Sequence, residues 1–256
     1  MFFQDIQIFK KHGKQFIKDL SNVVLPETFT GRPEIIKEPE GETALFLQNL
    51  CPTKAIDINP FSINIGKCVF CKECQFRCPE NIVFTNDFRM AVNCPEDLIV
   101  TYGVHKLEVT REIMRPEIKS FFKKTLKLRQ VSAGGDNSAE LELNAAGNVN
   151  FDMGRFGIEF VASPRHADGI VITGPISGNM AEALQKTFDA IPSPKLVILA
   201  GTDAISGGIF AESNSINRKF LSANTIDLYL PGNPPHPLTI INGLLYFINL
   251  KPLPKY

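Results

Sequence analysis

Residues 169–201, GIVITGPISGNMAEALQKTFDAIPSPKLVILAG, decide the fold of the second half of this chain of 256 residues. Two short apolar runs, Gly169–Thr173 and Leu196–Ala200, are each followed by a glycine, which is typical of buried parallel strands. Between them, residues 179–191 place apolar side chains at helical spacing, and Pro192 closes that helix. The stretch therefore predicts a strand, a helix and a second strand of one parallel sheet.

The same alternation continues on both sides of this unit. We expect further strands at residues 126–132, 157–162 and 226–230. We also expect one helix that follows Gly134 and Gly135 and runs through Ala145, and another over residues 236–250. Strands that alternate with helices predict a doubly wound, flavodoxin-like α/β domain over residues 126–256. Its working loops should follow the carboxyl ends of the strands.

The first half of the chain holds all six cysteines. Four of them follow the spacing C-x2-C-x2-C-x3-C-P, and these are Cys68, Cys71, Cys74 and Cys78. This spacing is typical of a ferredoxin [4Fe–4S] site, where the first three thiolates hold one cluster and the fourth points to another. Zinc sites usually use two separated cysteine pairs, so a triplet with one distant thiol favours iron and sulfur.

The fourth ligand of that cluster has two candidates. Cys51 precedes Pro52 and continues a ferredoxin-like pattern, which makes it our expected ligand; Cys94, which also precedes a proline, is the alternative. Counting back from Cys51 by the motif spacing reaches Leu47, Ala44 and Gly41, which cannot bind iron. We therefore expect one [4Fe–4S] cluster on Cys51, Cys68, Cys71 and Cys74, with Cys78 and Cys94 as orphan thiols.

The composition of the chain bears on its partners and on its cellular compartment. The chain has 27 basic and 27 acidic residues, so no global charge favours nucleic acid. Clustered cysteines without a secretory signal indicate a metal site in a reducing compartment. The apolar run at residues 239–250 is too short to span a bilayer and predicts a core helix.

Three regions surround the predicted cluster. Residues 1–24 are expected to contain an amphipathic helix, because the apolar residues between 2 and 20 share one face and lysines occupy the others. This face suits either a membrane surface or a protein partner, and Gly13 interrupts it. Residues 25–110 predict an α+β ferredoxin-like domain, poor in strands and organised by metal. Residues 111–125 predict a connecting helix.

Several loops of the α/β half resemble one protein family. They are Asp152 to Gly157, Ser163 to Asp168, Gly207 to Phe210 and Pro231 to Pro235. The resemblance is to the small cluster-bearing subunit shared by formate hydrogenlyase-type [NiFe] hydrogenases and complex I. The first half, including Phe29 to Glu34, resembles the ferredoxin-like subunit of the same complexes. The chain thus resembles a fusion of two neighbouring subunits.

The resemblance also contains a departure. The family's small subunit holds a [4Fe–4S] cluster through four cysteines, and the matching positions here are Asp136, Ala139, Asp203 and Asn233. This set of side chains cannot bind a cubane, because these clusters need thiolates. Oxygen ligands could recruit a hard cation; the simpler expectation is that these polar residues fill a degenerate cluster site and bond to its loops.

The resemblance implies an iron–sulfur electron-transfer subunit without a catalytic site of its own. It would belong to a membrane-associated hydrogenase-like or complex I-like oxidoreductase and dock a large-subunit homologue and other subunits of the complex. Its location would be cytoplasmic, peripheral to the inner face of the cytoplasmic membrane. The alternative is a scaffold, assembly or regulatory subunit whose cluster is structural or sensory.

Overall fold

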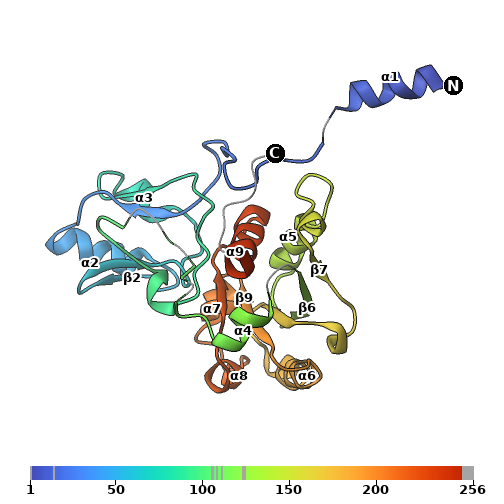
Figure 1. Cartoon of the computed structure of the whole chain (residues 1–256). Coiled ribbons are helices and arrows are strands. Elements are labelled where there is room, and N and C mark those ends of the chain that lie inside the picture. Colours follow the sequence, from blue (N-terminus) through green and yellow to red (C-terminus); the bar gives the residue numbers. More distant parts are fainter. Residues whose placement is uncertain are drawn as a thin grey trace.

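The computed structural model describes residues 2–249 except 14, 105, 106, 108, 111, 123 and 124. Figure 1 shows two parts side by side, with helix α9 (Pro237–Asn249) between them and helix α1 (Phe2–His12) extending away from both. The parallel sheet belongs to the second part, and the cysteine-rich segment belongs to the first.

A five-stranded parallel sheet forms the second part. Its strand order is β10-β9-β8-β6-β7, which is the flavodoxin-like order once these strands are numbered along the chain. The predicted α/β fold is therefore correct for this half. The strands are β6 (Leu126–Ser132), β7 (Ile158–Phe160), β8 (Gly169–Thr173), β9 (Leu196–Ala200) and β10 (Leu228–Leu230).

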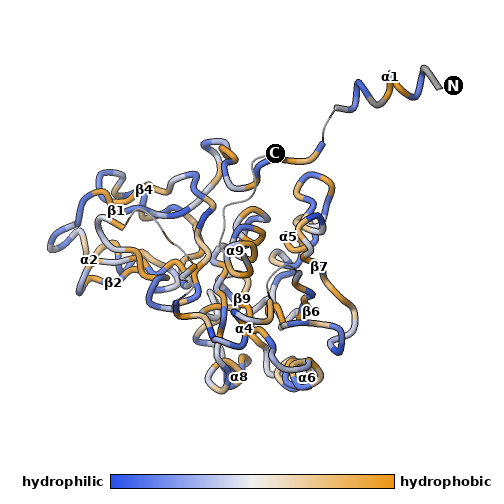
Figure 2. Tube along the Cα trace, in the orientation of Figure 1, coloured by the Kyte–Doolittle hydropathy of each residue, from blue (hydrophilic) through white to orange (hydrophobic). Residues whose placement is uncertain are grey.

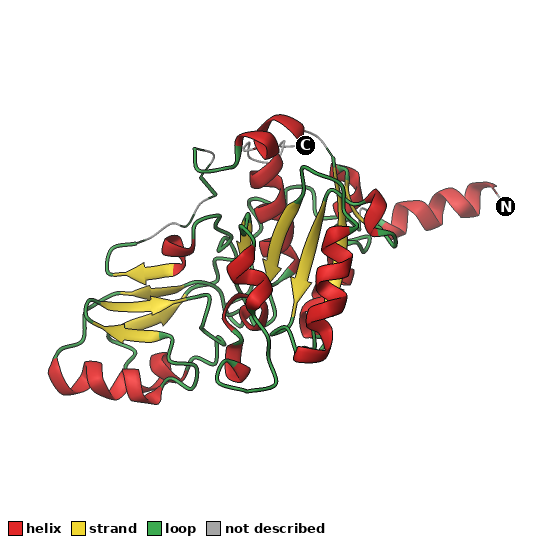
Figure 3. Cartoon of the chain, turned by 90° about the horizontal axis from the view of Figure 1, so that it is seen from below, coloured by secondary structure: helices red, strands yellow, loops and turns green. Residues whose placement is uncertain are grey.

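Helices cover both faces of this sheet, as Figure 3 shows. Along β8, Val171 joins the core beneath α9 and α5 (Ser138–Ala146), whereas Ile170 and Ile172 join the core beneath α6 (Gly178–Asp189) and α8 (Lys219–Ala223). Strands buried on both faces read as continuous apolar runs, and α9 and the central strands carry the apolar colour of Figure 2. The predicted core helix at the end of the chain is confirmed as α9.

Among its described residues, the first part contains two small antiparallel sheets, two α-helices and a short 3-10 helix (Pro95–Leu98). One sheet pairs β1 (Pro33–Ile35) with β4 (Ile82–Phe84), and the other has the order β2-β3-β5. These strands were not located from the sequence, because strands of three or four residues are too short to show alternation. The remaining elements are β2 (Ile56–Ile58), β3 (Phe61–Asn64), β5 (Ile99–Thr101), α2 (Gly41–Leu50) and α3 (Glu73–Arg77).

Helix α2 occupies the place where a first set of cluster cysteines would lie. Its buried residues Ala44 and Leu47 belong to the same apolar cluster as the buried thiol of Cys78. The thiol of Cys78 therefore lies in a packed core, and its role as an orphan thiol remains a prediction. Burial raises its pKa, and the charge of Glu80 adds to this effect.

The N-terminal helix is shorter than predicted. It ends at His12, and the next residue, Gly13, takes a left-handed φ of +61°, which commonly terminates a helix. The following residues 15–22, which we call the strap, run along the α/β part. The amide of Ile17 donates to the carbonyl of Asn150 (2.9 Å), and Leu20 is fully buried.

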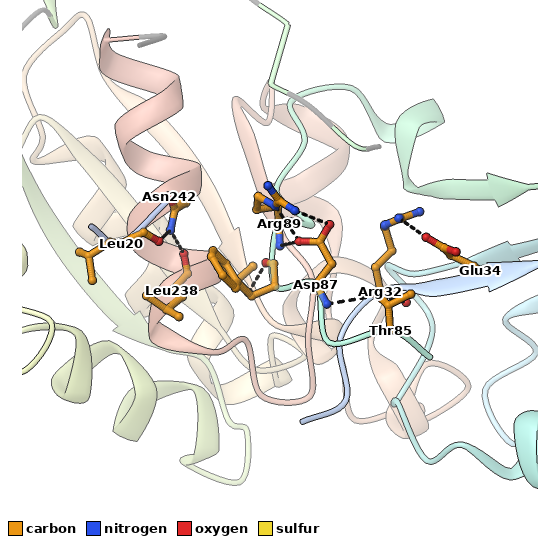
Figure 4. Close-up of polar contacts among 10 residues, drawn as sticks. Leu20, Arg32, Glu34, Thr85, Asp87, Arg89, Leu238 and Asn242 are labelled. Atoms are coloured by element: carbon orange, nitrogen blue, oxygen red, sulfur yellow. Dashed lines mark hydrogen bonds and ion pairs between the residues drawn. The ribbon is translucent and has the colours of Figure 1, made fainter. Parts of the chain in front are cut away.

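Polar contacts join the strap and the first part to α9, as Figure 4 shows. Asn242 donates its side-chain amide to the carbonyls of Leu20 (3.0 Å) and Leu238 (2.8 Å). One turn away, the hydroxyl of Thr239 donates to the carbonyl of Phe88 (2.7 Å). Helix α9 therefore binds the N-terminal strap and the cysteine-rich part at once.

The connecting segment contains a short helix, α4 (Pro116–Phe121), inside the predicted range. Its preceding residue, Arg115, forms a two-pronged ion pair with buried Asp227, with both N···O distances at 2.8 Å. Helix α7 (Thr202–Ser206), just after β9, was not predicted, because five residues carry no periodic signal. Across the described ranges, no helix combines the length and the apolar character that a bilayer crossing requires.

Candidate functional site

Four cysteines from two loops line one pocket in the first part, which we call the cysteine pocket. Cys51 comes directly after α2, and the other three come from the segment between β3 and the start of α3. The pocket has an empty volume of about 370 Å³, and apolar side chains supply much of the rest of its wall. The lining cysteines are Cys51, Cys68, Cys71 and Cys74.

The backbone of these loops directs amides toward sulfur. The amide of Phe70 donates to the sulfur of Cys68 (3.3 Å), and the amide of Ala55 donates to the sulfur of Cys51 (3.2 Å). Phe70 reaches this arrangement with a left-handed φ of 55°, and Lys54 precedes the second donor with a φ of 52°. Such strained turns cluster at functional sites, and N–H groups aimed at sulfur stabilise thiolates.

The buried thiols of this pocket are poor acids. Burial raises the pKa of Cys68 to about 12 and that of Cys74 to about 11, and the neighbouring cysteines add to both effects. Metal binding requires thiolates, so iron would have to displace these protons. Lys72 is the one basic side chain among the described lining residues, so four thiolates would leave an excess of negative charge that suits a cationic metal group.

The thiols surround a space and do not converge on one point. Within the described ranges, no three His, Cys, Asp or Glu side chains lie close enough to hold a single metal ion. A zinc ion needs all of its ligands on one centre, whereas each thiolate of a cubane binds its own iron. Four cysteines are the donor set that a [4Fe–4S] cluster uses, so the residues present fit such a group.

Cys94 lies apart from the cysteine pocket. It donates its thiol to a carboxylate oxygen of Glu96 at 2.6 Å, and this hydrogen bond raises its pKa. Its chain segment pairs instead with the edge of the parallel sheet, where Val92 bridges Tyr229. Cys51, and not Cys94, is therefore the fourth cysteine beside the triplet, and its role as a ligand remains a prediction.

The four positions of the predicted degenerate site also lie together, in what we call the switch-point pocket. It lies where the loops after β6, β8, β9 and β10 meet, which is the place where ligands bind in doubly wound folds. Its empty volume is about 240 Å³, and no cysteine is among its described lining residues. Asp136, Ala139, Asp203 and Asn233 all line it.

Local hydrogen bonds set the charges in the switch-point pocket. The hydroxyl and the amide of Ser138 donate to Asp136 at 2.6 and 2.9 Å, and they lower its pKa. Burial raises the pKa of Asp203, Asp136 adds to this effect, and Arg218 opposes it. The pocket is thus acidic and polar, and it offers no soft ligand for a cubane.

Asp203→Asn is expected to stabilise the protein at pH 7. Because folding raises the pKa of Asp203, its ionisation opposes folding: this cost is absent below the ordinary pKa of 3.8 and grows as the pH rises through the folded value. The gain should be about 1 kcal/mol or less, because Asp203 is partly exposed.

Thermal denaturation of both proteins from pH 3 to 8 measures this difference, with Asp189→Asn on the outer side of α6 as the control. A variant that is less stable than the parent at pH 7, or a gain that persists unchanged at pH 3, contradicts the expectation.

Three residues near these pockets were not among the predicted site residues. The hydroxyl of Thr202 donates to the carbonyl of Cys68, a residue 134 positions away. Arg218 donates to carbonyls of α7, and Glu140, although buried, accepts hydroxyls of Ser132 (2.5 Å) and Thr173 (2.6 Å). Such long-range partners cannot be read from spacing.

His236 does not belong to the switch-point pocket, although it is close to Asn233 in sequence. Its ring packs edge-on against Phe29 and Phe151, with centroids 5.1 and 5.8 Å away. Burial lowers its pKa. It therefore acts as a core aromatic residue between the two parts of the molecule.

Comparison with known proteins relates the α/β part to subunits of oxidoreductase complexes. Residues 137–247 match the family described as NADH ubiquinone oxidoreductase, 20 Kd subunit. A probable membrane-bound hydrogenase subunit, mbhJ of Pyrococcus furiosus, is 35% identical over 115 residues, which cover 45% of this chain and 69% of that protein.

Two other relatives are named as subunits of an F(420)H(2) dehydrogenase and of an NADH-quinone oxidoreductase. A subunit of the F(420)H(2) dehydrogenase of Methanosarcina mazei is 38% identical over half of this chain and 75% of its own length. A subunit of the NADH-quinone oxidoreductase of Clostridium beijerinckii is 42% identical over 41% of this chain and 63% of its own length.

A chain from a solved structure of the membrane-bound sulfane sulfur reductase, an archaeal respiratory membrane complex, is 25% identical. The matched region covers 53% of this chain and 75% of that chain, and the TM-score is 0.45.

Proposed function

This chain belongs to the family of the 20 kDa subunit of NADH:ubiquinone oxidoreductase, and from this premise we propose that it is an iron–sulfur electron-transfer subunit. The complex that it serves would be a membrane-associated, hydrogenase-like or complex I-like oxidoreductase. The relatives are named as subunits of a membrane-bound hydrogenase, an NADH-quinone oxidoreductase and an F(420)H(2) dehydrogenase, which supports the proposal.

The observation that carries the proposal is the cysteine pocket. Cys51, Cys68, Cys71 and Cys74 line it together, and they would hold one [4Fe–4S] cluster. When bound, such a cluster takes up and releases one electron at a time. Apolar side chains such as Ile56, Ile63 and Phe84 would limit water at its inner side, whereas exposed Cys71 would face the surface where electrons are exchanged.

The partners follow from the two-part architecture. The α/β part would dock a large-subunit homologue of a hydrogenase or of complex I. The ferredoxin-like part would be a second subunit joined to it in one chain. Helix α9 of the α/β part contacts both the strap and the backbone at Phe88 of the first part, and these contacts support the fusion.

The alternative function is a scaffold, assembly or regulatory subunit whose cluster is structural or sensory. The observation that favours it is the switch-point pocket, which has no cysteine among its described lining residues and so lacks ligands for a second cluster. Reversible reduction of the chain, with electron exchange to a partner, would exclude the purely structural role.

The test of the proposal is anaerobic purification followed by iron and sulfide analysis and electron paramagnetic resonance of the reduced protein. We expect about four irons and four sulfides per chain and the signal of one reduced cubane. Protein that never contacted air and contains no iron would overturn the proposal. About eight irons would overturn the assignment of a single cluster.

We propose that the chain is peripheral to the inner face of the cytoplasmic membrane and that α1 contributes to this location. Figure 1 shows α1 clear of the body, and within it Ile6 and Ile8 are exposed. Lys10 and Lys11 lie in its last turn, and Asp5 is its one acidic residue. A basic amphipathic helix binds anionic lipid through its apolar face and its charges.

Reversing charge in the double variant Lys10→Glu and Lys11→Glu is expected to weaken binding to anionic phospholipid vesicles about tenfold or more, because each lysine near such a surface contributes about 1 kcal/mol. Co-sedimentation with anionic and neutral vesicles measures it. The control reverses Lys186 and Lys219, which are exposed on α6 and α8. Equal binding by both variants would exclude α1 as the lipid contact.

A further inference from the structure

One residue joins the two pockets. Thr202 is the first residue of α7; it lines the switch-point pocket and is fully buried. Its hydroxyl oxygen lies 2.8 Å from the carbonyl oxygen of Cys68 and 3.2 Å from that of Gly232. The hydroxyl has a single proton, and the closer of its two acceptors belongs to Cys68, whose sulfur lines the cysteine pocket.

The backbone around Thr202 leaves its hydroxyl available for Cys68. The carbonyl of Gly232 already accepts a hydrogen bond from the backbone amide of Thr202 (2.9 Å). The backbone amide of Gly201 donates a hydrogen bond to the carbonyl of Leu230 (2.9 Å). The main chain of Thr202 is therefore held by the end of β10. The hydroxyl is one group through which the α/β part contacts residues 65–72, which we call the cysteine loop.

The cysteine loop approaches α7 closely at a second point. A Cβ atom on Gly66 would lie 2.8 Å from a methyl carbon of Ile205 in α7, which is closer than carbon atoms pack. Within the loop, the amides of Gly66 and Cys68 bond to the side chain and the carbonyl of Asn64 at 2.9 and 3.0 Å. The loop is thus a tight turn pressed against α7.

We propose that Thr202 is a positioning residue of the iron–sulfur site: through its hydroxyl, α7 fixes the Cys68 carbonyl and with it the turn that aims the Phe70 amide at the Cys68 sulfur. This inference rests on the proposed function, since it concerns the cluster that the four cysteines would hold. The described lining of the switch-point pocket has no ligands for a cluster. In this inference the pocket instead supports the cluster site in the neighbouring cysteine pocket.

The physical effect on the site is electrostatic as well as geometric. The hydroxyl proton offsets the negative end of the Cys68 carbonyl dipole near the cluster, and the charge around a cluster is one of the factors that set its reduction potential. Removing the proton leaves a buried carbonyl without its donor and makes the surroundings of the cluster more negative. Reduction, which adds an electron, becomes less favourable.

The test compares the midpoint potential of anaerobically purified full-length protein and three variants. Thr202→Val, which keeps the shape and loses the hydroxyl, is expected to shift the reduction equilibrium about threefold to tenfold toward the oxidised form, where tenfold corresponds to about 59 mV for one electron. Thr202→Ser keeps the hydroxyl and should match the parent. Thr187→Val, which removes a hydroxyl bonded within α6, is the matched control.

The outcomes separate this inference from the proposed function. Iron-free parent protein overturns both. A full cluster with the same potential and the same paramagnetic signal in the parent, Thr202→Val and Thr202→Ser overturns the positioning role alone. A lowered potential in Thr202→Val at full iron content, with an unchanged Thr187→Val, supports it. If Thr202→Val does not fold, Thr202→Ala removes the same hydroxyl with less crowding, and the same criterion applies to its potential.

Discussion

Cys68→Ser is expected to abolish the iron–sulfur cluster, reducing iron from about four per chain to nearly none. Cys68 is the most enclosed of the four cysteines of the cysteine pocket, at 8% exposure, and it accepts the amide of Phe70. Serine is a hard and weakly acidic ligand, so it replaces a thiolate poorly on iron. Because metal binding energy is also folding energy, the first part should lose stability with the metal.

Iron and sulfide analysis of anaerobically purified variants measures this loss, and circular dichroism follows the fold. Cys51→Ser should behave as Cys68→Ser does, whereas Cys94→Ser and Cys78→Ala should keep about four irons, because neither thiol lines the cysteine pocket. Full iron content in Cys68→Ser would contradict the assignment of the site. Loss of iron in Cys94→Ser with retention in Cys51→Ser would reverse the choice of the fourth ligand.

Gly31→Ala is expected to destabilise the protein by about 3 kcal/mol or more. Gly31 lies just before β1, where its amide and that of Arg32 donate to the carbonyls of Thr85 (2.8 Å) and Asp87 (2.9 Å). An added Cβ would lie 2.3 Å from the Asp87 carbonyl oxygen and 2.8 Å from its backbone nitrogen. Main-chain atoms cannot rotate away, so the segment that carries Phe88 toward α9 must shift.

Anaerobic thermal denaturation measures this change, and a decrease in Tm of roughly 10 °C is expected for a chain of this size. The control is Gly147→Ala. The φ of Gly147 is −88°, and an added Cβ would meet no atom closer than 3.5 Å. A melting temperature of Gly31→Ala within a few degrees of both the parent and the control would contradict the close approach seen between Gly31 and Asp87.

The sequence was most informative where one side-chain pattern determines the structure. Strands β8 and β9 lie at the predicted residues, because a strand buried on both faces is a continuous apolar run with sharp ends. The cysteine spacing placed Cys68, Cys71 and Cys74 on one loop, and the four degenerate positions do meet in one pocket. Ligand assignment stays a prediction in both cases.

The sequence was least informative where partners are far apart along the chain. The length of α1 was overestimated, because Ile17 and Leu20 fit the helical period, yet they pack against the α/β part in the extended strap. The contact of Thr202 with Cys68 and the ion pair of Arg115 with Asp227 depend on tertiary structure. No local propensity encodes such contacts.

The strap and the cysteine loop share a consequence for biosynthesis. Leu20 bonds to Asn242, which lies 222 positions later, and Cys68 bonds to Thr202, which lies 134 positions later. Residues made early by the ribosome therefore complete their contacts with residues made much later. A cluster inserted into the nascent chain before α7 is made would be held by a Cys68 turn that lacks its hydrogen bond from Thr202. The Cys68 turn therefore gains its full set of contacts only after the chain has been made beyond α7.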